Sequence, residues 1–207
     1  MSYILRAPEP EDLDLLFRLE NDPAVWTVSS CHMPYSRYAL RQYILTCQND
    51  FFAEKQLRLM VQPQGGGEAE AIVDLFNFSP LDGRAELGLV VDGASRGRGV
   101  GQQALALLCD YAARTLGLRM IFCQIFADNA ACRHLFAKMG FKEVATLPKW
   151  VQAEGILHDL VVVQRFFLKK NLKNVCRYEK SAYLCNRNPG GQQRKVKRKK
   201  RFHNSFR

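Results

Sequence analysis

Three alternating glycines and two arginines form the segment whose residue types most clearly indicate a binding function. The segment is Arg96-Gly97-Arg98-Gly99-Val100-Gly101. Glycines permit a sharp turn and leave the backbone N–H groups unobstructed. The helix predicted after them adds unpaired N–H donors and the positive end of its dipole. Such a loop binds a multiply charged anion, for which a pyrophosphate is the best candidate. A glycine turn with two solvated arginines is the alternative that these six residues leave open.

Two common phosphate-binding loops do not match this segment. A P-loop has Lys followed by Ser or Thr after its last glycine, whereas Gln102-Gln103 follows Gly101. A dinucleotide-binding fold has the pattern G-x-G-x-x-G and an acidic residue about 20 positions later. Here the third glycine comes one residue early, and Leu118-Arg119-Met120-Ile121 contains no acid. We therefore do not expect the anion to be NAD.

Strands and helices are predicted on both sides of the loop. Residues 85–91 have the apolar pattern of a mostly buried strand. After the loop, apolar residues at helical spacing predict a helix that Gly117 ends. A strand over 119–127 follows, and then Asp128-Asn129 caps a short helix that Gly140 closes. Elsewhere we expect a strand over 3–6, a helix over 10–20, a helix with Ser36 as its N-cap, a hairpin of 58–62 and 71–78, and strands over 142–146 and 159–167.

This order of elements resembles the GNAT superfamily of acetyl-CoA-dependent N-acetyltransferases. The superfamily signature Arg/Gln-x-x-Gly-x-Gly/Ala falls on Arg96, Gly99 and Gly101, and 129–141 resembles the second half of the family's domain. The resemblance covers about residues 3–168. Within the superfamily the chain looks closest to the ribosomal-protein and spermidine acetyltransferases, because of the Leu19-Glu20-Asn21-Asp22 start and the Trp150…Gly155…Asp159 ending.

The resemblance implies an α/β (α+β) fold with a mixed, mostly antiparallel sheet of six or seven strands. Helices flank this sheet, and its central strands splay apart so that the acetyl-pantetheine arm lies in the gap. The backbone near 89–91 then faces the thioester, and the glycine loop holds the pyrophosphate. The implied cofactor-binding residues are Leu89, Val90, Val91, Arg96, Gly97, Arg98, Gly99, Val100, Gly101 and Asn129. Asn129 acting only as a helix cap is the alternative.

Acetyl transfer from a thioester to an amine needs orientation, a neutral amine and donors for the developing oxyanion. An alkylamine is almost wholly protonated at neutral pH, so attack requires a base or a water relay. Glu86 is the predicted catalytic base, because it lies on the strand expected to carry the cofactor. A strand glutamate paired with Arg84 or Arg119 is the alternative. Phe136 stands where many GNAT enzymes carry the tyrosine that protonates the CoA thiolate, which leaves the general acid open.

The acceptor site is expected between the segment 26–35 and a loop over 148–155. The predicted substrate-binding residues are Glu20, Trp26, Tyr35 and Trp150. A solvated helix end for Glu20 and ordinary buried aromatics are the alternatives. A polyamine, another small amine and a protein N-terminus all remain open as the acceptor.

The charge is concentrated at the C-terminal end. Residues 1–170 contain 18 Lys+Arg and 19 Asp+Glu, whereas residues 171–207 contain 12 Lys+Arg and a single acid, Glu179. We expect a near-neutral acetyltransferase domain over 1–170 and a basic, disordered tail over 171–207. The tail could contact RNA, DNA or an anionic membrane; an extension without function is the alternative.

The rest of the composition favours a cytoplasmic enzyme without a metal. No apolar run is long enough to span a bilayer, and the first residues lack a signal peptide's pattern. The seven cysteines are an odd number without metal-binding spacing. A monomer and a homodimer both remain open. The predicted function is acetyl-CoA-dependent N-acetylation of a primary amine. The alternatives are a CoA-binding module with weak or lost catalysis and an RNA- or ribosome-associated protein acting through its tail.

Overall fold

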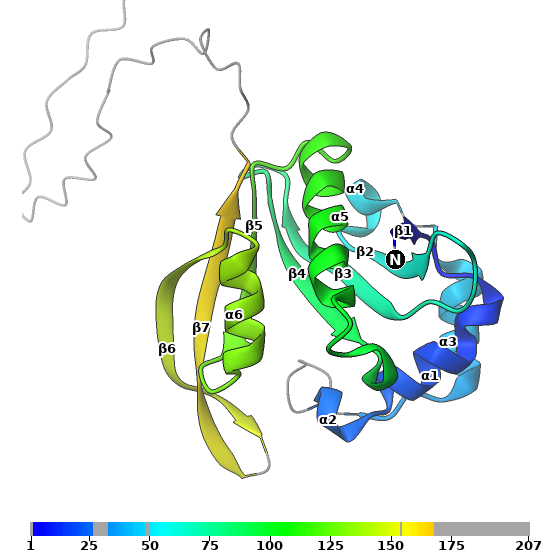
Figure 1. Cartoon of the computed structure of the whole chain (residues 1–207), viewed down its shortest axis with the longest axis horizontal. Coiled ribbons are helices and arrows are strands. Elements are labelled where there is room, and N and C mark those ends of the chain that lie inside the picture. Colours follow the sequence, from blue (N-terminus) through cyan, green and yellow to red (C-terminus); the bar gives the residue numbers. More distant parts are fainter. Residues whose placement is uncertain (1, 27–32, 49, 154, 168–207) are drawn as a thin grey trace, which may run out of the picture. The chain divides into compact units, whose positions relative to one another are not determined.

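A seven-stranded sheet in the order β1-β2-β3-β4-β5-β7-β6 organises the described part of the chain (Figure 1). This computed structural model describes residues 2–26, 33–48, 50–153 and 155–167. β4 and β5 are parallel, and the other neighbouring strands are antiparallel. The predicted mixed, mostly antiparallel sheet is therefore confirmed. The strands are β1 Tyr3–Arg6, β2 Leu57–Pro63, β3 Ala71–Ser79, β4 Arg84–Val91, β5 Met120–Phe126, β6 Lys142–Ala153 and β7 Ile156–Phe166.

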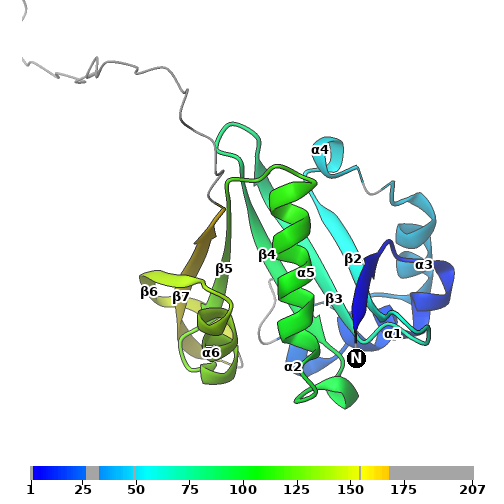
Figure 2. The same ribbon diagram turned by 45° about the horizontal axis from the view of Figure 1, so that its top comes forward.

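Helices cover both faces of this sheet (Figures 1 and 2). α5 and α6 pack on one face, where they share a core with alternate residues of β2 to β5 and β7. α1 and α3 pack on the opposite face against β2 and β3. The helices are α1 Leu13–Glu20, α2 Pro23–Trp26, α3 Arg37–Thr46, α4 Phe51–Glu54, α5 Val100–Arg114 and α6 Ala130–Lys138, with short 3-10 turns at Pro10–Asp12 and Gly93–Ser95.

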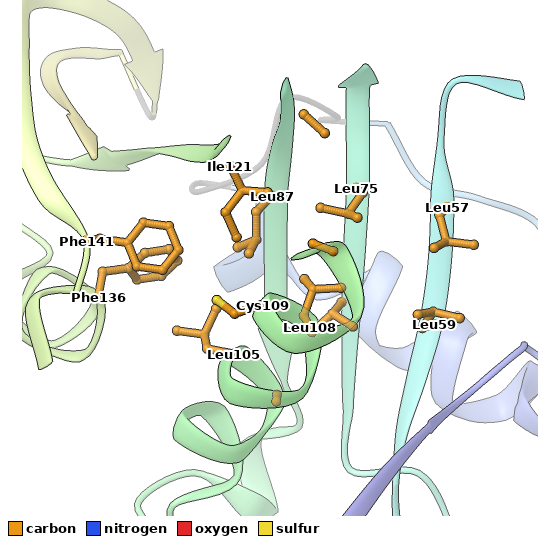
Figure 3. Close-up of a cluster of buried hydrophobic side chains, with 14 of the residues drawn as sticks. Leu57, Leu59, Leu75, Leu87, Leu105, Leu108, Cys109, Ile121, Phe136 and Phe141 are labelled. Carbon is orange, nitrogen blue, oxygen red and sulfur yellow. The ribbon is translucent and has the colours of Figure 1, made fainter. Parts of the chain in front are cut away.

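The main core lies between α5 and the sheet (Figure 3). Successive strand residues point to opposite faces, so every second residue of β2, β3 and β4 reaches the apolar side of α5. At the side of α6, the rings of Phe136 and Phe141 meet edge to face with centroids 4.8 Å apart. Burying one such large apolar side chain contributes about 1.5–3 kcal/mol, so this contact fixes α6 to the strand that follows it.

Two local predictions differ from the structure. The short helices α2 and α4 were not predicted, because four residues are too few to show a helical period. The predicted loop over 148–155 was wrong for most of its length, since β6 continues to Ala153. β6 is an edge strand, where a proline removes no necessary donor. A register shift between Leu147 and Val151 and a left-handed Lys149 (φ 52°) accommodate Pro148.

β4 and β5 separate after a short stretch of pairing. They pair only from Arg84–Met120 to Glu86–Phe122. Beyond this point β4 stays paired with β3 as far as Val91, and β5 stays paired with β7 as far as Phe126. The predicted splay of the central strands is thus confirmed. The edge of β4 that follows Glu86 carries backbone groups without a strand partner on the side of β5.

The basic segment 171–207 lies outside the described residues. Among the residues that are described, no helix is long and apolar enough to cross a membrane.

Candidate active site

Glu86 lies at the last paired position before β4 and β5 separate. Its side chain is buried, with 7% of its surface exposed. One carboxylate oxygen accepts a hydrogen bond from Asn77 Nδ2 at 2.8 Å and the other from Gln124 Nε2 at 3.0 Å. The alternative of a pair with Arg84 or Arg119 is excluded, because both arginines bind Asp82 instead. Glu86 is therefore a buried carboxylate held by two neutral amides.

Local structure places both amides toward Glu86. Asn77 sits in an irregular part of β3, between Phe76 and Ser79, and has a left-handed backbone (φ 48°) that asparagine tolerates. Gln124 is on the neighbouring β5, two residues beyond the partner of Glu86, on the same face. Sequence reasoning missed both residues. The available signal was a lone amide in each strand, most visible for Gln124 in the otherwise apolar β5.

The glycine loop turns the chain from β4 into α5. Gly97 (φ 74°) and Gly99 (φ 83°) adopt left-handed conformations, and Gly99 is the N-cap of α5. A Cβ on Gly101 would lie 3.2 Å from Leu135 Cδ2 and 3.5 Å from Val91 Cγ2, so glycine here lets α5 pack closely on β4 and α6 without displacing Leu135. The N–H groups of the first turn, on residues 100–102, have no partner within the helix. The predicted anion-binding loop thus has the required backbone geometry.

The two arginines of the loop differ in their contacts. Arg96 is exposed, and its Nε donates to the carbonyl oxygen of Val91 at 3.2 Å. Arg98 forms an ion pair with Glu70 at 3.6 Å, and Glu70 also accepts from the Tyr3 hydroxyl at 2.7 Å. Arg96 is therefore the better placed cation for an anionic ligand, whereas the charge of Arg98 is partly balanced within the fold.

The other predicted cofactor residues occupy the two sides of the gap. Leu89 and Val91 lie on the unpaired part of β4 and pack toward α5, whereas Val90 packs toward α1 and α3. Asn129 is the N-cap of α6, and its side-chain oxygen accepts from the Cys132 N–H at 3.0 Å. The capping role of Asn129 is confirmed; its contact with the cofactor stays a prediction.

Two thiols and a phenylalanine lie on the α6 side of the gap. Burial raises the pKa of Cys132 to about 11. Burial, with the nearby Cys132 and Glu86, raises the pKa of Cys123 well above its ordinary value. Both are therefore neutral thiols near pH 7, which fits the prediction that they are not nucleophiles. Phe136 is 1% exposed and packs in the core, and its ring carries no proton to donate.

Three of the four predicted acceptor residues come together at the end of α1. The backbone oxygen of Glu20 accepts from Trp26 Nε1 at 2.6 Å. Asn21 donates to the carbonyl oxygen of Tyr35 and accepts from its N–H. Trp150 lies instead on the edge strand β6 and is 63% exposed. Residues 27–32 of the predicted acceptor wall, and Glu154, lie outside the described residues.

Glu20 is not the solvated helix end that its position suggested. Its carboxylate accepts from Arg58 Nη1 at 2.5 Å, and Arg58 also binds Asp74 at 2.8 Å. Burial lowers the pKa of Arg58, but the carboxylates of Asp74 and Glu20 outweigh it and hold that pKa above its ordinary value. Two carboxylates thus share one guanidinium, which leaves this group of three with a net negative charge.

Comparisons with known proteins agree with this geometry. The family model described as Acetyltransferase (GNAT) domain matches residues 3–142. The spermidine N(1)-acetyltransferase of Escherichia coli K12 is 22% identical over 192 residues, which cover 91% of this chain and 92% of that protein. An N-acetyltransferase named p20 from Bacillus licheniformis is 25% identical over 162 residues, 75% of this chain and 88% of that protein. The crystal structure of spermidine N-acetyltransferase from Vibrio cholerae in complex with CoA and spermine matches with a TM-score of 0.72 at 20% identity, covering 80% of this chain and 95% of that chain.

Since the family model spans well over half of the sequence, the chain belongs to the GNAT acetyltransferase family. It is an N-acetyltransferase that moves an acetyl group from acetyl-CoA to an amine.

Proposed function

We propose that the acceptor is a primary amine of a small polyamine and that Glu86 receives the proton of its ammonium group. The observation that carries this proposal is the environment of the Glu86 carboxylate, at the point where β4 and β5 separate. It is buried on two neutral amides, and among the described residues no cationic side chain forms an ion pair with it. A buried carboxylate without a cation is unfavourable. An ammonium substrate supplies the missing charge.

A second negative group lies on the same face of the sheet. Asp74 is directly across from Gly88, and Glu86 precedes Gly88 by two residues, so Asp74 and Glu86 are diagonal neighbours. Such neighbours lie about 7–8 Å apart. A Cβ on Gly88 would lie 3.4 Å from Asp74 Cβ and 3.5 Å from Phe76 Cε1, so this glycine lets Asp74 and the Phe76 ring pack closely against β4. Together with Glu20 and Arg58, these carboxylates give this face of the sheet a net negative charge, which suits an acceptor with several ammonium groups. The relatives named spermidine acetyltransferases support the same class of acceptor.

Different residues of the site serve different steps of acetyl transfer. Acetyl-CoA supplies an acetyl group that the thioester has already activated. Residues 97–101 and the first turn of α5 bind its pyrophosphate through backbone N–H groups. Glu86 takes one proton from the ammonium group, directly or through a water, which leaves the nitrogen lone pair free to attack the carbonyl carbon. Backbone N–H groups of β4 beyond Glu86 donate to the carbonyl oxygen as negative charge develops. As the amide forms, the nitrogen loses a second proton, which water passes to the departing thiolate, since Phe136 has none to give.

Thiol release from acetyl-CoA by the full-length protein tests the acceptor. The amines to compare are spermidine, spermine, an alkyl monoamine of equal length, an aminoglycoside and short peptides with free N-termini. We expect kcat/KM for spermidine to exceed that for the monoamine by about tenfold or more, since one additional ion pair with a partly buried carboxylate contributes on the order of 1–3 kcal/mol. The product should gain one acetyl group by mass spectrometry. A preference for peptides, or CoA binding without turnover of any amine, would overturn the proposal.

We also propose that residues 1–170 form the acetyltransferase domain and that 171–207 form a basic tail that contacts nucleic acid. The 12 Lys+Arg and single acid of 171–207 support this assignment. Replacing the basic residues of 195–201 with glutamine should lower the salt dependence of RNA binding and leave acetyl transfer unchanged. An unchanged salt dependence would remove the tail from RNA binding. A cytoplasmic location is part of the proposal, supported by Cys109, Cys123 and Cys132, which form no disulfide within the described residues.

A further inference from the structure

Three arginine–aromatic pairs gather at the end of the sheet where β4 and β5 begin and β7 ends. None of their side chains takes part in the acetyl-transfer site. In each pair the guanidinium lies over a ring: Arg84 over Phe122 at 5.8 Å, Arg119 over Phe166 at 5.6 Å, and Arg165 over Phe167 at 5.9 Å. Arginine lying on an aromatic face is also the arrangement in which proteins hold a planar base.

The register of the strands brings the first two of these pairs to one face of the sheet. Arg84 is across from Met120, and Met120 is across from Phe166. The strands β4, β5 and β7 therefore place Arg84, Met120 and Phe166 side by side across this end of the sheet. Cross-strand partners share a face of the sheet, so Arg84 and Phe166 both lie on the face opposite α5 and α6. The third pair lies on the other face of the sheet, because successive strand residues point to opposite faces and Phe167 packs against the core beneath α5.

A hollow of about 430 Å³ lies beside Phe166. Its lining residues are Gly140, Lys142, Gln164, Arg165 and Phe166. The hollow forms because β6 begins at the Lys142–Gln164 pair, while β7 continues two residues further to Phe166. Gly140 (φ 81°) turns the chain there without a side chain that could fill the space. Phe166 is 48% exposed, which leaves a ring available at the hollow.

The surroundings of this hollow are positively charged, although residues 1–170 as a whole are close to neutral. Within the described residues, Lys142, Arg119 and Arg165 form no ion pair with a carboxylate. Asp82, which lies in the turn before β4, and Glu143, which follows Lys142, are already engaged in ion pairs, with Arg84 at 3.2 Å and Arg133 at 2.8 Å. Lys142 therefore keeps a charge that can neutralise an anionic ligand, whereas Arg119 Nε donates to the carbonyl oxygen of Asp82 at 3.0 Å and Arg165 lies beside the Cys109 thiol.

We propose that this surface, called the Phe166 patch and made of Arg84, Arg119, Phe122, Lys142 and Phe166, binds single-stranded nucleic acid. A base stacks on Phe166 in the hollow, and Lys142 contacts a phosphate next to it. Base stacking on aromatic rings combined with a basic groove is the general means of holding single strands. A duplex offers no unstacked base to such a ring. An acidic peptide does not need the ring, and a membrane surface is contacted by protruding groups rather than by a hollow. The proposal is independent of the acetyl acceptor.

Fluorescence anisotropy with a labelled oligouridylate and the full-length protein tests the patch. Phe166→Ala should weaken binding by about tenfold or more without changing the salt slope, because stacking one base contributes about 1–3 kcal/mol. Lys142→Gln should reduce the salt slope by about 0.7. The matched controls are Tyr38→Ala, which removes a 74% exposed ring on α3, and Lys55→Gln. Both controls should bind like the parent protein, and all four variants should keep their acetyl-transfer rate.

Binding measurements with further ligands distinguish between the possible partners. An oligothymidylate bound as well as the oligouridylate assigns the site to any single strand, and weaker binding assigns it to RNA; both support the proposal. Equal binding by Phe166→Ala and Tyr38→Ala overturns it, as does preferred binding of a duplex. A phosphopeptide or phosphatidylserine vesicle whose binding depends on Phe166 as strongly would assign the patch to that partner and also overturn it. If Phe166→Ala unfolds, Phe166→Leu keeps the apolar bulk without the ring and should show the same loss.

Discussion

Removing one of the two amides that hold Glu86 should lower the rate of acetyl transfer without removing the carboxylate. Gln124→Met keeps the length and volume of the side chain and deletes the donor that lies 3.0 Å from Glu86. Asn77→Gly deletes the donor at 2.8 Å and tolerates the left-handed backbone at this position (φ 48°). Both variants leave the glycine loop and α5 untouched.

The expected loss of rate follows from the energy of the hydrogen bond that each variant deletes. A hydrogen bond to a charged group contributes about 1.5–3 kcal/mol, and each 1.36 kcal/mol changes a rate by tenfold. Each variant keeps one of the two bonds, so we expect kcat/KM to fall by about tenfold to a hundredfold. The fall should lie mainly in kcat, because a displaced carboxylate still attracts the ammonium group but no longer meets its proton at the right position.

Steady-state thiol release with acetyl-CoA and spermidine measures both constants. Gln164→Met is the matched control, since Gln164 lies on the same face, across β5 from Glu86, and pairs with Phe122. It should retain the parental kcat. If Gln124→Met and Asn77→Gly also retain it, the two amides do not position Glu86 for the reaction and the reasoning is refuted.

Three further predictions concern the frame of the site. Phe136→Ala should destabilise the fold by about 3–5 kcal/mol, seen as a lower urea midpoint with an unchanged slope; a change below about 1 kcal/mol would contradict its place in the core. Gly99→Ala should cost about 1–2 kcal/mol, because Gly99 has φ 83°, and calorimetry should show weaker CoA binding; unaltered affinity would argue against this loop. Since burial raises the pKa of Cys132 from 9.0 to about 11, iodoacetamide at neutral pH should alkylate it up to about a hundredfold more slowly than a free thiol, with the rate rising until the pH passes that pKa. Alkylation at the free-thiol rate would contradict the burial of Cys132.

Sequence was sufficient where neighbouring residues determine the structure. The left-handed glycines at 97 and 99 and the caps at Ser36 and Asn129 each depend on contacts within a few positions. Caps and glycine turns have strong residue preferences for that reason. The family signature lies in the same local segment, so the cofactor loop was predictable together with its geometry.

The surroundings of Glu86 could not be predicted in the same way. Asn77, Glu86 and Gln124 come from three strands, and their meeting depends on the register of β3, β4 and β5 and on the irregularity after Phe76. A register is set by the packing of whole strands, so a single residue does not reveal it. For the same reason the ion pairs of Arg58 with Glu20 and Asp74 had no sequence signal.

Acetylation of spermidine by Glu86→Gln, followed over about pH 6–9, tests most directly whether this carboxylate receives the proton of the amine. Glutamine keeps the size of the side chain but has no carboxylate to accept a proton. We predict that kcat falls by about a hundredfold to ten-thousandfold, the usual contribution of a general base, while calorimetry shows unchanged CoA affinity. A parental kcat for Glu86→Gln throughout this range would contradict the assignment of Glu86.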